Sequence, residues 1–214
     1  MAAAPEQLAS LRHLIAGRFP APPRPAGGVL PTGVPALDEA AGGLPLGAVT
    51  ELVAAPGAGG QSVLARILGA ARATRQRVAL IDATDAFAPE AVEQDELRHL
   101  VWARARNVRE AFAVADVLMR DGNFSSVILD IRDVPVRELK RTPKSNWHRF
   151  HRVAERQPAA VLVMSSFGVV PAVRWRLTLA APWSLTELHR TREALACHLA
   201  VEAVRGPRRE EMAG

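Results

Sequence analysis

Residues 44–62 read LPLGAVTELVAAPGAGGQS, and this stretch decides the fold of the chain. Branched and apolar residues at 48–54 predict a short buried strand. The turn at 55–60 is rich in glycine, and Gln61 and Ser62 open a predicted helix. A strand that runs through glycines into a helix gathers backbone N–H groups and the positive end of the helix dipole around one point, where an anion can bind.

The glycine turn departs from the phosphate-loop pattern G-x-x-x-x-G-K-[ST] at two defining positions. Residues 55–62 read APGAGGQS, so Ala55 replaces the first glycine and Gln61 replaces the lysine. Gly60 and Ser62 keep the second glycine and the hydroxyl. The sequence leaves two interpretations open, which are residual nucleotide binding and a turn whose glycines only connect a strand to a helix.

Length and composition place the chain among globular proteins. Its 214 residues suit one domain, and no apolar run approaches the roughly 20 residues of a membrane span. The N-terminus lacks the basic start and apolar core of a signal peptide, so we expect a cytoplasmic protein without membrane contact. The single cysteine, Cys197, excludes an internal disulfide, and no cluster of metal ligands is predicted.

Apolar runs and amphipathic segments alternate along the chain. Helices are predicted at residues 34–41, 62–74, 89–97, 108–120 and 147–156, and strands at 77–82, 99–103, 126–130, 159–165, 172–180 and 196–204. Continuous apolar strands between helices predict an α/β fold with a mostly parallel central sheet covered on both faces. The last two strands are expected to form an antiparallel C-terminal extension.

Three parts of the chain are distinguished by composition. Residues 1–28 combine a predicted amphipathic helix with a proline-rich linker, residues 29–204 form the core domain, and residues 205–214 form a polar tail. The N-terminal helix either covers the core of its own domain or docks on a neighbouring molecule.

The order of these signals resembles the core of RecA-type recombinases over roughly residues 30–204. The resemblance is carried by LPTGVPALDEAAGGLPLGAVTEL, the glycine loop, ALIDATDAFAP, VILDI and VLVMSS. Among RecA-like proteins, the chain is most similar to the ImuA-type accessory proteins, which assist a Y-family-like polymerase in bacterial translesion synthesis. The resemblance implies a RecA-like three-layer core, a role in the SOS response to DNA damage at the nucleoid, and a Y-family-like polymerase or RecA recombinase as partner.

The resemblance also implies a degenerate catalytic site. In the family, the loop lysine neutralises the β- and γ-phosphates and the adjacent hydroxyl holds Mg²⁺. Here Ser62 keeps the hydroxyl, Gln61 carries no charge, and Thr84 stands at the catalytic glutamate, where its hydroxyl cannot act as a general base. Asp130 matches the acid that holds a metal-bound water, or alternatively forms a helix N-cap or an ion pair. The implied nucleotide site comprises Gly57, Gly59, Gly60, Gln61, Ser62 and Asp130.

The most charged segment is residues 136–152, VRELKRTPKSNWHRFHR. Basic side chains with interleaved aromatic rings suit phosphate contact and base stacking. The candidates for DNA contact are Arg137, Lys140, Arg141, Lys144, Trp147, Arg149 and Arg152. In the alternative interpretation, Trp147, Phe150 and Val153 point into the core and the cations lie on a solvated helix face. His148 and His151 are predicted to be surface residues and not metal ligands.

The favoured hypothesis is a non-catalytic RecA-like adaptor that needs no cofactor. One alternative is a weak switch that binds ATP and Mg²⁺ through Ser62, Asp130 and the loop amides. Another is a DNA-binding protein that uses residues 136–152. Residues 167–171 are too few for a mobile second DNA loop, which argues against recombinase-type filaments.

Overall fold

The computed structural model describes residues 28–173, 175–179, 183–184, 186–191, 194–195 and 198–205. The predicted N-terminal helix with most of its linker, residues 1–27, lies outside the described residues, as does the tail from residue 206 onward. Among the helices that are described, none is both long and apolar enough to span a membrane.

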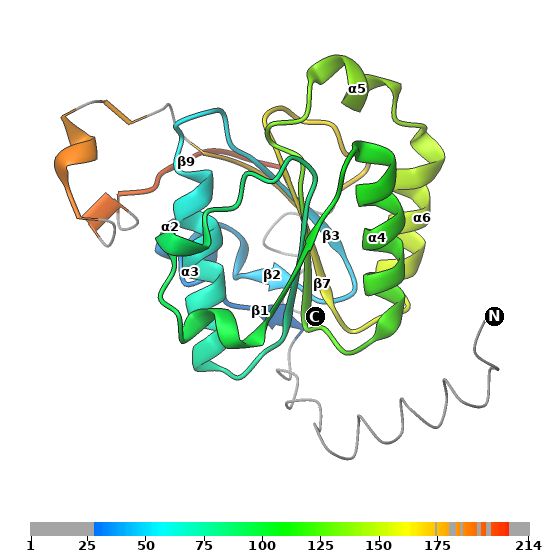
Figure 1. Ribbon diagram of the computed structural model, residues 1–214, viewed down its shortest axis with the longest axis horizontal. Helices are drawn as coiled ribbons and strands as arrows, with labels where there is room; N and C mark the ends of the chain where they lie inside the picture. The colour runs from blue at the N-terminus through cyan, green and yellow to red at the C-terminus, as the bar shows by residue number, and fades with distance from the viewer. Residues whose placement is uncertain are drawn as a thin grey trace.

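A seven-stranded sheet forms the middle layer (Figure 1), in the order β5-β4-β6-β7-β3-β8-β9. The strands are β3 (Val49–Val53), β4 (Val78–Asp82), β5 (Leu100–Arg104), β6 (Ser126–Asp130), β7 (Ala160–Ser165), β8 (Trp175–Leu179) and β9 (Val201–Arg205). Every neighbouring pair is parallel except β8 and β9, which are antiparallel. The predicted sheet is therefore confirmed, and β8 joins it in parallel to β3.

Helices cover both faces of this sheet. In Figure 1, α2 (Pro35–Ala41) and α3 (Gly60–Ala73) lie on one side, and α4 (Val108–Asp121) and α6 (Lys144–Ala154) on the other. Two separate clusters of buried apolar side chains fill the spaces between the layers. The three-layer arrangement is consistent with a RecA-like core.

Some predicted elements differ from the structure. The helix expected at 89–97 is wrong, because extended backbone at Val92 separates two short 3-10 turns, Pro89–Ala91 and Glu96–His99. The strand expected from residue 172 begins at Trp175, since Ala172 has a positive φ of 53°. The sequence analysis missed α5 (Val136–Arg141) and the antiparallel pair of β1 (Val29–Leu30) and β2 (Leu44–Pro45).

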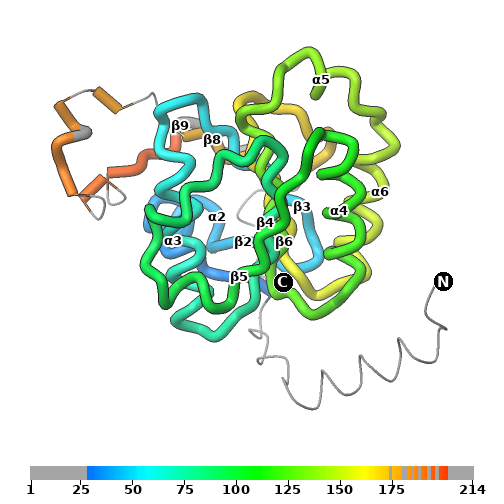
Figure 2. The backbone as a smooth tube through the Cα atoms, viewed as in Figure 1, coloured from blue at the N-terminus to red at the C-terminus, as the bar shows by residue number. Residues whose placement is uncertain are grey.

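The sheet order brings the predicted site residues to one edge. Parallel strands end at the same edge, so the loop after β3 lies at the same edge as the ends of β4, β6 and β7 (Figure 2). In the register of the sheet, Asp82 at the end of β4 is directly opposite Asp130 at the end of β6. Val53 is opposite Ser165 at the end of β7.

Candidate functional site

The glycine loop connects β3 to α3 through residues in the left-handed region. Gly57 has φ 79°, and Gly59, the N-cap of α3, has φ 88°. The Ala58 N–H donates to the Ala55 carbonyl at 3.0 Å and closes the turn. Side chains other than glycine are strained at such φ values, so part of the glycine pattern has a purely conformational cause.

A cation lies against this loop, and it comes from Arg132. The Arg132 guanidinium donates from Nε to Asp130 Oδ1 at 2.9 Å and from Nη2 to Oδ2 at 2.5 Å. A Cβ added to Gly60 would overlap the same guanidinium, so Arg132 fills the space beside the first residue of α3. Asp130 is therefore in a buried ion pair, which is one of the alternatives that the sequence left open.

The charges around Arg132 do not favour a polyphosphate. Burial of the guanidinium acts to lower its pKa, but the ion pair with Asp130 raises the pKa of Arg132 above its ordinary value, with further contributions from Asp133 and Asp82. Three carboxylates thus surround one cation that is only 13% exposed. A triphosphate would bring additional negative charge to a site where the positive charge is already paired.

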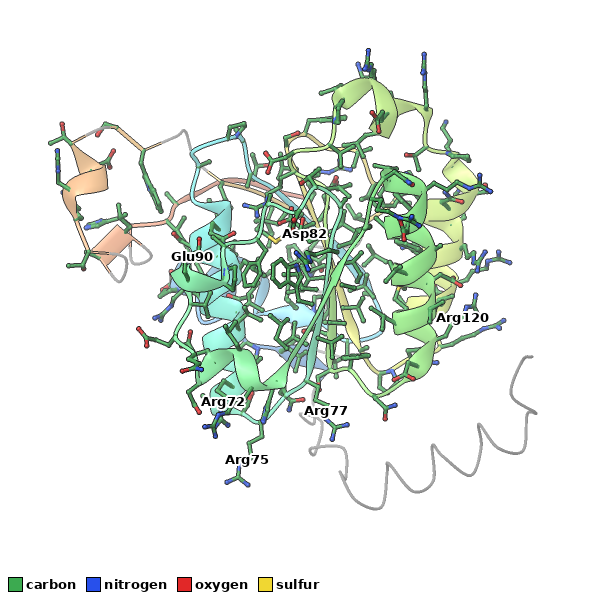
Figure 3. All side chains as sticks on the ribbon, in the orientation of Figure 1. Arg72, Arg75, Arg77, Asp82, Glu90 and Arg120 are labelled. Carbon is green, nitrogen blue, oxygen red and sulfur yellow. The ribbon has the colours of Figure 1, made fainter. Side chains whose placement is uncertain are left out.

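Asp82 organises the turn that follows β4. Its buried carboxylate accepts hydrogen bonds from the backbone N–H groups of Thr84 at 3.2 Å, Ala86 at 3.1 Å and Phe87 at 2.9 Å. Asp85 turns outward with φ 57° and pairs with Arg104 at 3.7 Å. Figure 3 shows Asp82 in the interior, far from Arg72, Arg75 and Arg77 at the opposite end of the molecule. Asp82 therefore stabilises the backbone, and Asp85 faces solvent.

A segment near the C-terminus covers the glycine loop. The Trp183 N–H donates to the Gly57 carbonyl at 3.2 Å. A Cβ added to Gly59 would lie 2.6 Å from Leu199 Cδ2 and 2.8 Å from Trp183 Cζ2. Trp183 and Arg132 both line the cavity of about 400 Å³ at the loop, so side chains from two distant parts of the chain border the loop on this side.

Gln61 and Ser62 also line this cavity. The Gln61 amide nitrogen is buried and has no hydrogen-bond partner among the described residues. Because Gln61 brings an uncharged amide to the lysine position, the loop itself supplies no cation.

A second buried network, absent from the sequence analysis, holds the loop after β7. Glu51 on β3 is completely buried and pairs with Arg176 on β8 at 2.6 Å. The same carboxylate accepts from Ser165 Oγ at 3.0 Å and from the N–H groups of Val169 at 2.7 Å and Val170 at 3.1 Å. Ser165 at the end of β7 is therefore bonded to a buried protein carboxylate.

The basic segment places its aromatic residues in the core. Trp147 and Phe150 are each 2% exposed and pack edge-to-face with centroids 6.0 Å apart. The prediction that Trp147 stacks on DNA bases is wrong, because α6 turns its apolar face toward the sheet. Phe150 and Val153 are buried on the same face, as the alternative interpretation predicted.

The basic side chains of this segment are exposed and are distributed over α5 and α6. Arg137, Lys140 and Arg141 are on α5, and Lys144 begins α6. Arg149 pairs with Asp116 of α4, and Arg152 lies farther along α6. His148 is exposed and His151 Nε2 is 2.9 Å from the Pro171 carbonyl oxygen. No group of three or more potential metal ligands occurs in the part of the chain that the structure describes.

Comparison with known proteins gives a partial match. No protein-family model matches the chain. A segment of 106 residues, 48% of the chain, is 30% identical to RecA of Streptomyces ambofaciens and 32% identical to RecA of Methylococcus capsulatus. Over this segment the chain is distantly similar to RecA. The matched segment covers only 28% and 30% of those two RecA proteins, so the similarity extends over a minor part of each of them. The finer resemblance to ImuA-type proteins stays a prediction.

Sequence reasoning missed Arg132, Trp183 and Glu51. A weak signal existed for Arg132, since it is a cation only two residues after the strand-end acid Asp130. Glu51 interrupts an apolar strand, which indicates a buried partner. No local signal connects Trp183 with the glycine loop.

Proposed function

We propose that the chain is a RecA-like accessory protein of DNA repair that works without nucleotide turnover. Its core serves as a binding platform for a translesion polymerase or for a RecA recombinase protomer. The observation that carries the proposal is the Arg132–Asp130 ion pair against Gly60, in which the cation beside the loop is already paired with a protein carboxylate.

Three features support a non-enzymatic role. The lysine position holds Gln61, the candidate metal-binding acid Asp130 is paired with Arg132, and the turn after β4 presents Thr84 where a general base is needed. Each change alone would weaken catalysis, and together they remove the charge, the metal ligand and the base. The core retains its sheet and both helical layers, which a binding role requires.

The test uses the purified full chain in two measurements. In pull-down assays with purified RecA and with a Y-family polymerase, we expect association with at least one of them, equal with and without Mg-ATP. Loss of association with both would overturn the adaptor role. In a phosphate-release assay we expect no activity, with RecA as positive control. Magnesium-dependent release that Asp130→Ala abolishes would overturn the non-enzymatic role.

A thermal-shift titration with Mg-ATP separates the adaptor from the weak switch. We expect no change in Tm, because a ligand that binds the folded state raises Tm and the cation beside this loop is already paired with Asp130. A rise in Tm that Ser62→Ala removes would support the switch instead.

A further inference from the structure

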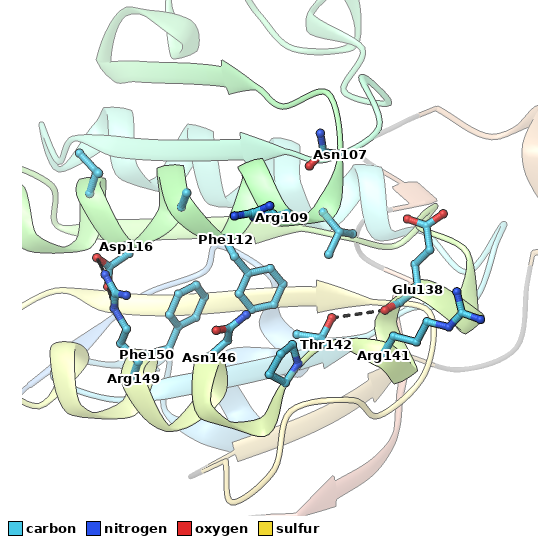
Figure 4. A pocket seen from close by; sticks show the side chains of 14 residues that line it. Asn107, Arg109, Phe112, Asp116, Glu138, Arg141, Thr142, Asn146, Arg149 and Phe150 are labelled. Atoms are coloured by element: carbon cyan, nitrogen blue, oxygen red, sulfur yellow. Dashed lines mark hydrogen bonds and ion pairs between the residues drawn. The ribbon is translucent and has the colours of Figure 1, made fainter.

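A groove with a volume of about 820 Å³ lies between α4 and the α5–α6 segment (Figure 4). We call it the α4–α6 groove. Its apolar lining includes Phe112, Ala113 and Val117 of α4 and Phe150 of α6. Ala113 is exposed, and the Val117 side chain is 64% exposed. The groove is therefore an open apolar surface on the opposite face of the sheet from α3.

The aromatic rings below the groove are already in contact with one another. Phe112 and Phe150 are stacked with centroids 5.1 Å apart, and Trp147 meets Phe112 edge-on at 4.8 Å. Figure 4 shows the two phenylalanine rings facing each other between the helices. Since Phe112 and Phe150 are only 6% and 2% exposed, they offer no open ring face for a nucleic-acid base, whereas aliphatic side chains can pack on the apolar surface that they support.

The rim of the groove is basic. Arg109 and Arg141 line it and form no ion pair with any described residue, and Glu138 is an acidic residue beside them. At the other end, Asp116 is shared by Arg120 and Arg149. An adjoining hollow of about 270 Å³ adds two further arginines, Arg152 and Arg156. Six arginines thus face two carboxylates along the groove and its extension.

We propose that the α4–α6 groove binds an amphipathic helix of a partner protein, in which apolar residues are flanked by Asp and Glu. The apolar floor matches the apolar stripe of such a helix, and the arginines at both ends match its acidic flanks. This inference rests on the proposed adaptor function and names the surface through which the partner is held.

The test is a selection from displayed peptides of about 14 residues, the length of α4. All peptides carry Leu, Ile, Phe or Met at helical spacing. Three arms of the library differ only at the flanking positions, which are Asp/Glu, Lys/Arg or Ser/Asn. We expect the full chain to enrich the acidic arm. Enrichment of the basic or neutral arm, or of none, overturns the proposal.

Variants then place the enriched peptide on the groove. Ala113→Trp fills the groove from an exposed position, and Arg109→Glu combined with Arg141→Glu reverses the charge of its rim. Each should weaken binding by at least about tenfold. The matched control is Arg137→Glu, on α5 but outside the groove lining, and it should leave affinity within about twofold. Unchanged circular dichroism and Tm verify that each variant is folded.

Two outcomes at this stage overturn the proposal. Equal binding of the peptide to Ala113→Trp and to the unmodified chain shows that the peptide sits elsewhere. A single-stranded oligonucleotide that binds the unmodified chain, displaces the peptide and is lost in Ala113→Trp assigns the groove to nucleic acid. The pull-down with whole partner proteins is a separate measurement. If the peptide selection fails while the pull-down succeeds, the groove is rejected as the binding site and the adaptor role still stands.

Discussion

Glu51 and Arg176 are directly opposite each other on the parallel strands β3 and β8, and their side chains form an ion pair at 2.6 Å inside the sheet. Arg176 also donates to the Val170 carbonyl at 2.5 Å, while Glu51 accepts from the Val169 and Val170 N–H groups. The pair therefore fixes the short loop after β7, the segment that corresponds by resemblance to a DNA-gripping loop.

Glu51→Gln should destabilise the protein strongly. The substitution removes the charge opposite Arg176 and leaves a cation with 25% side-chain exposure unpaired, which costs about 3 kcal/mol or more. Urea unfolding measures the loss. Glu39→Gln, on the exposed face of α2, is the control and should change the free energy of unfolding by less than about 0.5 kcal/mol. Equal effects of the two substitutions would contradict the importance of the network.

Much of the fold was accessible from the sequence because the signals were local. Apolar runs marked each parallel strand of the sheet, and the helix predicted at 108–120 is α4, which ends at Asp121 before Gly122 with φ 75°. The prediction of a helix at 89–97 was wrong because the 3-10 turn that begins at Pro89 ends at the extended residue Val92. The second 3-10 turn, Glu96–His99, then packs against α3.

Arg132→Ala should also destabilise the fold, by about 3–5 kcal/mol, because it leaves Asp130 charged and buried without a partner. Arg104→Ala removes the arginine of an ion pair in which both side chains are more than half exposed and should cost less than about 1 kcal/mol. Chemical denaturation of both variants checks the difference. Combining Arg132→Ala with Asp130→Asn should recover part of the loss, since no unpaired charge remains; a fully additive double variant would argue against the pairing.

Gly59→Ala should cost more stability than Gly42→Ala. Both glycines have positive φ, 88° and 74°, so both substitutions introduce backbone strain of about 1 kcal/mol. Only Gly59 would in addition bring its Cβ within 2.6–2.9 Å of Leu199 and Trp183, whereas nothing lies within 4 Å of Gly42. Thermal unfolding compares the two, and an equal loss of Tm would indicate that Trp183 does not pack on the loop in solution.

Gln61→Lys should not restore ATP binding. The new cation would join a loop that Arg132 and Trp183 already border, next to the carboxylate of Asp130. We expect no rise in Tm beyond about 1 °C with Mg-ATP, whereas RecA in the same assay should be stabilised by its ligand. The double variant Gln61→Lys with Arg132→Ala then tests whether Arg132 is what prevents ATP from binding. A shift for Gln61→Lys alone would show that only the missing lysine prevents binding.

The ion pairs of Asp116 predict a pH dependence. Burial acts to raise its pKa, but hydrogen bonds from Arg149 and Arg120 lower the pKa of Asp116 below the ordinary value. A carboxyl group whose pKa is lower in the folded than in the unfolded state stabilises the folded protein at pH values above its unfolded-state pKa of about 3.9. This contribution disappears as the pH falls through the lower folded-state pKa.

Asp116→Asn should therefore lower Tm by a few degrees at neutral pH, and its difference from the unmodified chain should close in acid. Scanning calorimetry across the acidic range measures this. The exposed Glu90→Gln, which breaks no ion pair among the described side chains, should follow the unmodified chain at every pH. A difference in Tm between Asp116→Asn and the unmodified chain that is the same at every pH would contradict the assigned ion pairs.

The candidate site was less accessible from the sequence than the fold. The glycine loop and Asp130 were found because strand ends and glycines are local features. The contacts that define the site join distant residues: Glu51 meets Arg176 across 125 positions, and Trp183 reaches Gly57 from beyond β8. Such pairs depend on strand order, which residue spacing does not encode. Whether Trp147 lies in the core or on the surface was ambiguous for a related reason. The answer depends on which face of α6 packs against the sheet.

The position of Arg132 beside Gly60 has a consequence for how such a protein responds to metabolism. A loop held by a diffusible ligand changes with the adenylate supply of the cell, but this loop is held by a side chain of constant abundance. For a chain that works without nucleotide turnover, as we propose, the conformation of this loop should be the same in starved and in growing cells.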